Sequence, residues 1–124
     1  MERIINLTQH VPTYDQMKAG VITPSDHDAV KKLLTFNELP TTEQIASSAE
    51  QLASTAAGEA FAADTKYVMI GGAPFLMAPL ESALLAKGLV PLYAFSKRVS
   101  VEETQKDGSV VKRNVFKHIG FIGG

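Results

Sequence analysis

The sequence predicts an α/β fold, a Rossmann-like three-layer domain with a mostly parallel sheet and a C-terminal β-hairpin. An apolar run at 67–70, within a predicted strand at 66–70, ends at a Gly-Gly pair (71–72), and Pro74 then opens a helical segment. A second apolar run follows at 89–95, and a strand, helix and strand at this spacing form a βαβ unit with parallel strands. Asp107 precedes a glycine between two β-rich segments, which is a strong hairpin signal.

The elements before the βαβ unit follow from short apolar runs and capping signals. The segment 3–8 is a short apolar run bounded by polar residues, so it predicts the first strand. Thr13 and Thr41 each stand three residues before a glutamine, which is the capping-box pattern that begins a helix. The first of these helices should end at Gly20, and a further helix is expected at 25–36.

The two later helices should be the main packing elements. The helix after Thr41 is expected to be long, with one small-residue apolar face. That face consists of Ile45, Ala49, Leu52, Ala53 and Ala56. The next helix should run over 73–87 and end at Gly88, which suits a left-handed terminator. Both faces of the strand at 66–70 are apolar, so helices are expected on both sides of the sheet.

The last part of the chain has the pattern of β-strands without helices. Residues 99–104 and 110–121 are β-rich and flank the turn sequence at 106–109. We therefore expect a single domain over 1–124, with an α/β part at 1–95 and a β-hairpin extension at 96–124. The final two glycines are expected to fray.

Composition excludes several classes of function. The net charge of −1 gives no global field that would attract duplex nucleic acid or a membrane surface, although seven Lys or Arg stand against three acids from Lys87 onward. The chain has no cysteine, so disulfides, thiolate nucleophiles and Cys-ligated zinc are excluded. No signal peptide or membrane-spanning run is visible, which predicts a cytoplasmic protein.

Polar groups follow three of the predicted strands. In open parallel sheets, ligands bind beyond the carboxyl ends of the strands. The three ends deliver, in order, Thr8, Gln9 and His10; Gly71, Gly72 and Ala73; and Ser96, Lys97 and Arg98. Backbone N–H groups at a helix N-terminus favour a phosphate, as do two cations. The pattern predicts a phosphate or nucleotide site, with His10, Lys97 and Arg98 as catalytic candidates and the other six residues binding the ligand.

Each part of this site also has a structural interpretation that the sequence leaves open. The Gly-Gly pair can form a tight turn only, His10 can be an ordinary loop histidine, and the two cations can be solvated. His118 is expected to be half-buried and structural, and His27 to lie on the surface of a helix. The three histidines are scattered, so neither a metal nor another cofactor is expected.

The same residues restrict the chemistry. GxGxxG, Walker and GxSxG motifs are all absent, and carboxylates are scarce at the strand ends, which argues against two-metal hydrolysis. The available groups fit metal-free RNA cleavage better, in which the substrate's own 2′-OH is the nucleophile. The protein would then orient that hydroxyl, stabilise the phosphorane and move a proton through His10.

Two parts of the chain resemble a known family. The segments 91–103, 107–112 and 114–121 resemble the C-terminal third of small CRISPR-associated proteins that have a CRISPR-associated Rossmann fold (CARF). Residues 6–10 followed by 13–16 are similar to the opening of those proteins, where a strand ends in a hydroxyl and a histidine before a Thr-x-x-Gln helix start. The middle of the chain matches in layout alone.

This resemblance implies a function. CARF proteins of this kind are homodimers that bind a cyclic oligoadenylate across their two-fold axis, and the ring nucleases among them cleave it without metal. Carried over by position, the candidate residues of the three strand ends would line each half-site. The family's active residues vary between branches, so the resemblance leaves the catalytic residues open. Alternatives are a non-catalytic nucleotide- or phosphate-sensing module, and a prophage- or defence-associated interaction protein that uses the hairpin as an oligomer interface.

Overall fold

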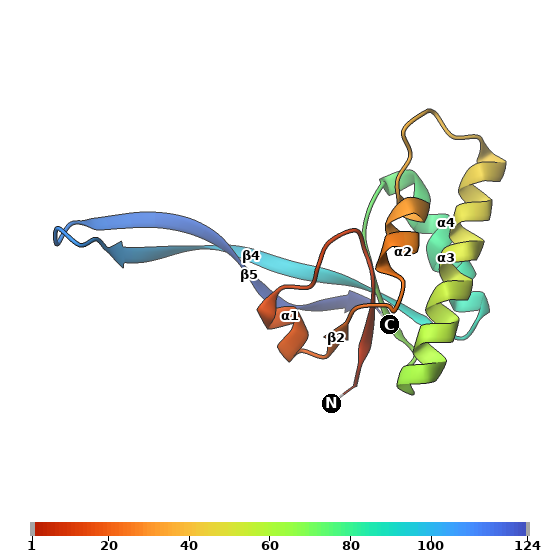
Figure 1. The fold of residues 1–124 in the computed structure, drawn as a ribbon, viewed down its shortest axis with the longest axis horizontal. Coiled ribbons are helices and arrows are strands. Elements are labelled where there is room, and N and C mark those ends of the chain that lie inside the picture. The colour runs from red at the N-terminus through yellow and green to blue at the C-terminus, as the bar shows by residue number, and fades with distance from the viewer. Residues whose placement is uncertain (1, 124) are drawn as a thin grey trace.

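The structure, a computed structural model, describes residues 2–123 and consists of one five-stranded sheet with four helices (Figure 1). The strands are β1 (Ile4–Leu7), β2 (Val21–Ile22), β3 (Tyr67–Ile70), β4 (Val90–Thr104) and β5 (Val110–Gly123). Their order in the sheet is β2-β1-β3-β4-β5, and the first four run parallel while β5 pairs antiparallel with β4. The predicted mixed α/β class, mostly parallel with a C-terminal antiparallel hairpin, is confirmed. The two-residue strand β2 was not predicted.

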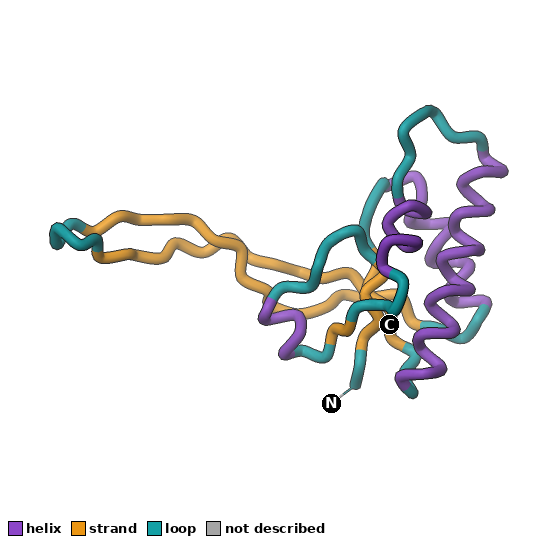
Figure 2. The backbone as a smooth tube through the Cα atoms, viewed as in Figure 1, coloured by secondary structure: helices purple, strands orange, loops and turns teal. Residues whose placement is uncertain are grey.

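The helices begin where the capping signals lie. They are α1 (Tyr14–Lys18), α2 (His27–Leu34), α3 (Thr42–Ala63) and α4 (Pro74–Ala86), as Figure 2 shows along the backbone. Thr13 and Thr41 each accept a hydrogen bond from the backbone of a glutamine three residues on, and the glutamine side chain bonds back to the cap. Both predicted capping boxes are therefore confirmed.

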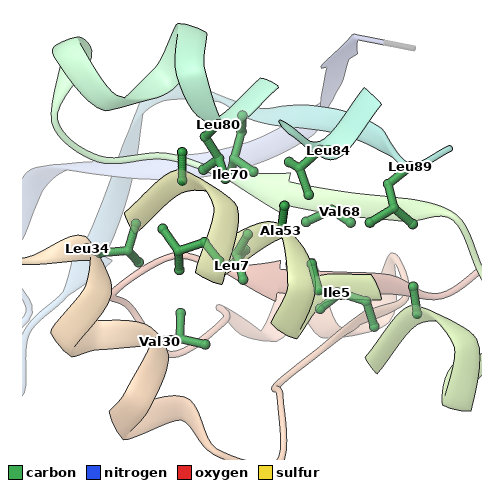
Figure 3. Packing of buried hydrophobic residues seen from close by; sticks show 14 of the residues in the cluster. Ile5, Leu7, Val30, Leu34, Ala53, Val68, Ile70, Leu80, Leu84 and Leu89 are labelled. Carbon is green, nitrogen blue, oxygen red and sulfur yellow. The ribbon is translucent and has the colours of Figure 1, made fainter. Parts of the chain in front are cut away.

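The main core lies between one face of the sheet and helices α2, α3 and α4 (Figure 3). Ile5, Leu7, Val68 and Ile70 are buried on this face, because alternate residues of a strand point to the same side. The alanines of α3 are buried against them, and their small side chains allow the helix to approach the sheet closely. Burial of this apolar face stabilises the chain by about 25 cal/mol per Å² removed from water.

Helices α2, α3 and α4 leave the opposite face of the sheet uncovered, and we call it the bare face. Its buried cluster consists of Ile4, Val21, Met69 and Leu92, and the side chains packed against it also come from strands. The expected three-layer arrangement is therefore not confirmed. The strand order explains why the helices lie on one side. The connections from β2 to β3 and from β3 to β4 both run in the same direction across the sheet. Because such connections are right-handed, α2, α3 and α4 all lie on one face. The step from β1 to β2 is reversed, but α1 buries none of its residues.

The hairpin is a long projection from the body of the molecule. The sequence predicted a strand that ends at Phe95, but β4 continues to Thr104 and pairs with β5 from Leu92 onward. A β-bulge lies between Phe95 and Ser96, where the register skips Ile119. Beyond this bulge the two strands leave the sheet as a ribbon (Figure 1). We call residues 96–118 the arm, and the rest of the described chain the body.

Two expectations about this region were wrong for a physical reason. The polar residues after Phe95 suggested a strand end, but both faces of a two-stranded ribbon meet solvent, so polar residues can continue a strand there. Gly123 was expected to fray, but it pairs with Leu92 inside β5. Gly124 lies outside the described residues. The turn itself was predicted correctly, and Gly108 adopts a φ of 86° there.

Candidate functional site

A pocket of about 440 Å³ lies at the carboxyl ends of the parallel strands. It is formed by the loop after β1, the loop after β3 and the middle of β4. Five of the predicted site residues line it together: Thr8, Gln9, His10, Gly71 and Gly72. The other four candidates, Ala73, Ser96, Lys97 and Arg98, are not among its lining residues. The structure thus brings two of the three predicted strand ends to one place, and the roles of the residues stay predictions.

The loop after β1 is held in shape by Asn6, which sequence reasoning missed. Asn6 is completely buried, and its side-chain amide donates a hydrogen bond of 2.8 Å to the carbonyl of His10. Its Oδ1 accepts bonds from the backbone N–H of Thr8 at 3.1 Å and from the Thr8 hydroxyl at 2.7 Å. A buried polar side chain must find partners, so an asparagine inside an apolar strand was the available signal.

Helix α2 supports the same loop from its other side. The prediction that His27 lies on the surface was wrong, since His27 is half-buried and its Nε2 lies 2.8 Å from the carbonyl oxygen of Thr8. The side-chain amide of Gln9 donates a bond of 3.0 Å to the Thr35 hydroxyl. With these contacts, the backbone from Thr8 to His10 is fixed at both ends while the His10 side chain stays exposed.

The two glycines of the loop after β3 differ in conformation. Gly72 has a φ of 149°, a value that favours glycine, whereas Gly71 has no positive φ. The helix α4 starts two residues later with Pro74 in its first turn, and its cap residue Ala73 makes no side-chain capping bond. Pro74 has no N–H and the N–H of Leu76 donates to the Ala73 carbonyl at 3.0 Å, so the first turn of α4 offers an anion at most the N–H of Phe75.

Tyr93 adds a wall to the pocket that the sequence did not reveal. Its hydroxyl donates a hydrogen bond of 2.9 Å to Oε2 of Glu81 on α4. Burial, and then the bond and the charge of Glu81, raise the pKa of the Tyr93 phenol to about 12. The phenol is therefore neutral around pH 7, and its proton is already committed to Glu81. Tyr93 thus offers a ligand its ring rather than a free hydroxyl donor.

The predicted cations lie beyond the pocket, on the arm. Lys97 is three residues past the lining residue Ala94, which corresponds to ~10 Å along an extended strand. Lys97 and Arg98 are neighbours in a strand, so their side chains point to opposite faces. Arg98 lies over the ring of Phe116, with its guanidinium carbon 5.3 Å from the ring centroid. The two cations therefore do not act from one side.

Lys97 instead shares its face with Lys117, its direct partner across the ribbon. Like charges at directly opposite positions of a sheet destabilise it, unless an anion lies between them. Sequence reasoning overlooked Lys117, because the register of the hairpin is needed to bring it opposite Lys97. None of the described residues that line the pocket is Lys, Arg, Asp or Glu. Along β4, this lysine pair is the positive charge nearest to the pocket.

Neither a metal-binding cluster nor a membrane-spanning helix is found in residues 2–123. In that part of the chain, no three side chains of histidine, cysteine, aspartate or glutamate gather in a way that could hold a metal ion. No helix in the same part is both long and apolar enough to cross a membrane.

A family model matches residues 2–122, which is nearly the whole chain. The chain belongs to the uncharacterized protein MJ1673 family. This description of the MJ1673 family carries no activity, ligand or partner, so the resemblance to CARF proteins stays a prediction. Neither a curated protein nor a solved structure matches the chain.

Proposed function

We propose that this member of the MJ1673 family binds a cyclic oligoadenylate, and that two copies of the chain each provide one pocket. The observation that carries the proposal is the meeting of the β1 and β3 loops in one pocket at the carboxyl edge of the sheet. The glycine backbone at Gly71 and Gly72 allows a phosphate to approach closely there. Lys97 and Lys117 supply positive charge further along β4.

The size of the pocket supports two copies rather than one. Pockets of about 300–1,000 Å³ hold one drug-sized ligand, and this one, at about 440 Å³, is at the lower end. A ring of several nucleotides is larger, so its remaining nucleotides would extend over the root of the arm and into the pocket of the second copy. A symmetric dimer would present the same groups twice to a symmetric ring.

The groups present also support metal-free cleavage of the ring. The 2′-oxygen of one nucleotide attacks the adjacent phosphorus, the bond to the 5′-oxygen breaks, and a 2′,3′-cyclic phosphate forms. The proton leaves the 2′-oxygen and ends on the 5′-oxygen. His10 is the histidine on the pocket lining, and we assign it this proton transfer. We assign stabilisation of the phosphorane to the backbone at Gly72, and binding of neighbouring phosphates to Lys97 and Lys117, which lie beyond the pocket. Arg98 stacks on Phe116 and is assigned no role.

One observation favours the second candidate, a sensing module that binds without cleaving. None of the described pocket-lining residues is a carboxylate, so the lining supplies no acidic partner that would orient the His10 ring. The Tyr93 hydroxyl is bonded to Glu81 and does not replace such a partner. A histidine without an orienting partner is a weaker general base than one held in place.

Direct binding and product analysis test both candidates. Labelled cyclic tetra- and hexa-adenylate are incubated with the pure protein in the presence of a chelator, and binding and products are measured separately. Lys97→Ala with Lys117→Ala should weaken binding by about tenfold or more, which is the effect of losing charge-assisted contacts. Lys32→Ala with Lys66→Ala removes two other exposed lysines and is the matched control.

Separate measurements of binding and cleavage distinguish a ring nuclease from a sensing module. His10→Ala should leave binding within a few-fold and slow cleavage by about 10²-fold or more, the usual contribution of a proton-transfer group. Binding without turnover in the unaltered protein supports the sensing module. Absence of binding to every ring size contradicts the proposal itself.

A further inference from the structure

We infer that the arm is the surface by which two copies of this chain associate, with the arm of each copy lying against the body of the other. The proposed function needs two copies, and this inference deepens it by naming the surfaces that join them. The inference does not depend on the ligand, because it is argued from the arm and the bare sheet face alone.

The first argument is that the arm has no support of its own. Each of its strands contributes nine residues after the bulge, which is ~30 Å of extended chain. Figures 1 and 2 show this ribbon projecting away from the sheet and the helices. A two-stranded hairpin is marginally stable in water unless further strands or a helix pack on it. We therefore expect a second surface to pack against this long ribbon and stabilise it.

The second argument is that one face of the arm carries four valines, which lie among the charged residues Lys97, Lys117, Glu103 and Arg113. The strand register places Val99 and Val115 opposite each other, and Val101 and Val111 follow on the same face. Val111 is 47% exposed, although β-branched residues favour a packed sheet surface. We call these four residues the valine stripe. An apolar stripe on a surface that nothing covers within the chain is typical of an interaction site.

Charge decides which surface the arm meets. The arm carries six Lys or Arg against three Asp or Glu, whereas the rest of the chain carries six against ten. The arm is therefore positive and the remainder negative. Packing arm on arm would bring like charges together, while packing arm on body pairs opposite charges. The complementarity selects the body of a second copy as the occupant, in preference to its arm.

The body offers an apolar surface to receive the arm. A groove of about 380 Å³ lies on the bare face of the sheet and is lined by Ile4, Tyr67, Leu92 and Phe121, with the acidic Glu2 beside them. His118, the last residue of the arm in the same copy, also lines this groove, and its Nδ1 is buried without a hydrogen-bond partner among residues 2–123. We place the valine stripe of one copy on this groove of the other, and the exchange occurs twice in a two-fold dimer.

Cross-linking in an isotope mixture tests this arrangement without any nucleotide. Normal and heavy-isotope-labelled chains are mixed, and a zero-length reagent then joins lysines to carboxylates. We expect a sedimentation mass of twice 13.3 kDa. We also expect mixed-isotope links between an arm lysine, such as Lys106 or Lys112, and carboxylates of the body.

A matched pair of variants tests the face of the arm. Val99→Lys with Val115→Lys should raise the dissociation constant of the dimer at least tenfold. Ser100→Lys with Asn114→Lys adds the same charges at an opposed pair on the other face of the ribbon, and should change that constant less than threefold. Both variants place two lysines opposite each other, so the repulsion within each new pair is shared. The second variant also removes the 3.0 Å hydrogen bond from the Ser100 hydroxyl to Asn114 Oδ1, so urea denaturation of both variants measures the remaining difference in stability.

Three results would overturn the inference. One is the mass of a single chain at every concentration. Another is mixed-isotope linking confined to arm lysines and the arm's own acids, which would mean arm on arm. The third is equal weakening by the two double variants. Tight binding of an RNA oligomer to a protein that stays monomeric would identify the arm as a nucleic-acid surface instead. A dimer that binds no cyclic oligoadenylate contradicts the proposed function and leaves this inference intact.

Discussion

The side-chain amide of Asn6 donates a 2.8 Å hydrogen bond to the backbone carbonyl of His10, and this bond ties the buried end of β1 to the exposed loop at the pocket. The same side chain accepts bonds from the backbone and the hydroxyl of Thr8. The core and the candidate site therefore share one residue, so the loop can change shape only if a buried polar group loses its partners.

Replacement of Asn6 by leucine should destabilise the protein. The leucine would fill the space but remove the three hydrogen bonds that Asn6 makes with Thr8 and His10, and one hydrogen bond contributes about 0.5–1.5 kcal/mol net. We expect the free energy of unfolding to fall by about 2–3 kcal/mol in urea denaturation. Asn37→Leu, at an exposed asparagine, is the control and should stay within about 0.5 kcal/mol. Similar values for both variants would mean that the Asn6 bonds contribute nothing.

The two pocket glycines should respond differently to alanine. At Gly72 the φ of 149° strains any side chain, although the nearest atoms, on Met77 and Leu34, leave room for a methyl group. We expect Gly72→Ala to cost about 1–2 kcal/mol in urea denaturation. Gly71→Ala should stay within about 0.5 kcal/mol, because its Cβ would meet the Thr8 methyl at an ordinary 3.7 Å. A reversed order would show that the backbone conformation of Gly72 is not what requires glycine.

Local signals in the sequence predicted most of the elements. A capping box, a Gly after an Asp in a turn, or a Pro at a helix start acts within a few residues, so Thr13, Thr41, Pro74 and Gly108 marked the structure correctly. The buried alanine face of α3 also followed from its helical spacing.

Features that depend on distant parts of the chain were not predictable in this way. The helices gather on one face because of the strand order, which no local pattern reveals. The continuation of β4 past Phe95 depends on pairing with β5, and the same register brings Lys117 opposite Lys97. Of the site, the convergence of the loops at His10 and Gly72 followed from the rule for parallel sheets.

The bond between Tyr93 and Glu81 should make stability depend on alkaline pH. Because the folded-state pKa of Tyr93 is raised from 10.0 to about 12, the phenol stays neutral in the folded protein while it ionises in the unfolded chain. The stabilisation is complete below pH 10.0 and is lost as the pH rises through about 12. Tyr93→Phe should lack this part of the decline, measured as the free energy of unfolding against pH.

Tyr14→Phe is the control for that experiment, since Tyr14 is 71% exposed. It should keep the same alkaline decline as the unaltered protein. At neutral pH, Tyr93→Phe should also lose about 1 kcal/mol for the missing hydrogen bond to Glu81. Parallel pH curves for Tyr93→Phe and the unaltered protein would contradict the assigned cause of the raised pKa.

The end of β5 should be intolerant of a side chain at Gly123. This residue pairs with Leu92 at a φ of 129°, and a Cβ built there would lie 2.5 Å from the carbonyl oxygen of Pro91, which is backbone and cannot move aside freely. We expect Gly123→Ala to cost about 1–3 kcal/mol in urea denaturation, because the strand end must shift or detach. Gly120→Ala, where a Cβ meets nothing within 4 Å, should stay within about 0.5 kcal/mol. If Gly123→Ala is equally harmless, then the strand end is frayed in solution, as the sequence alone suggested.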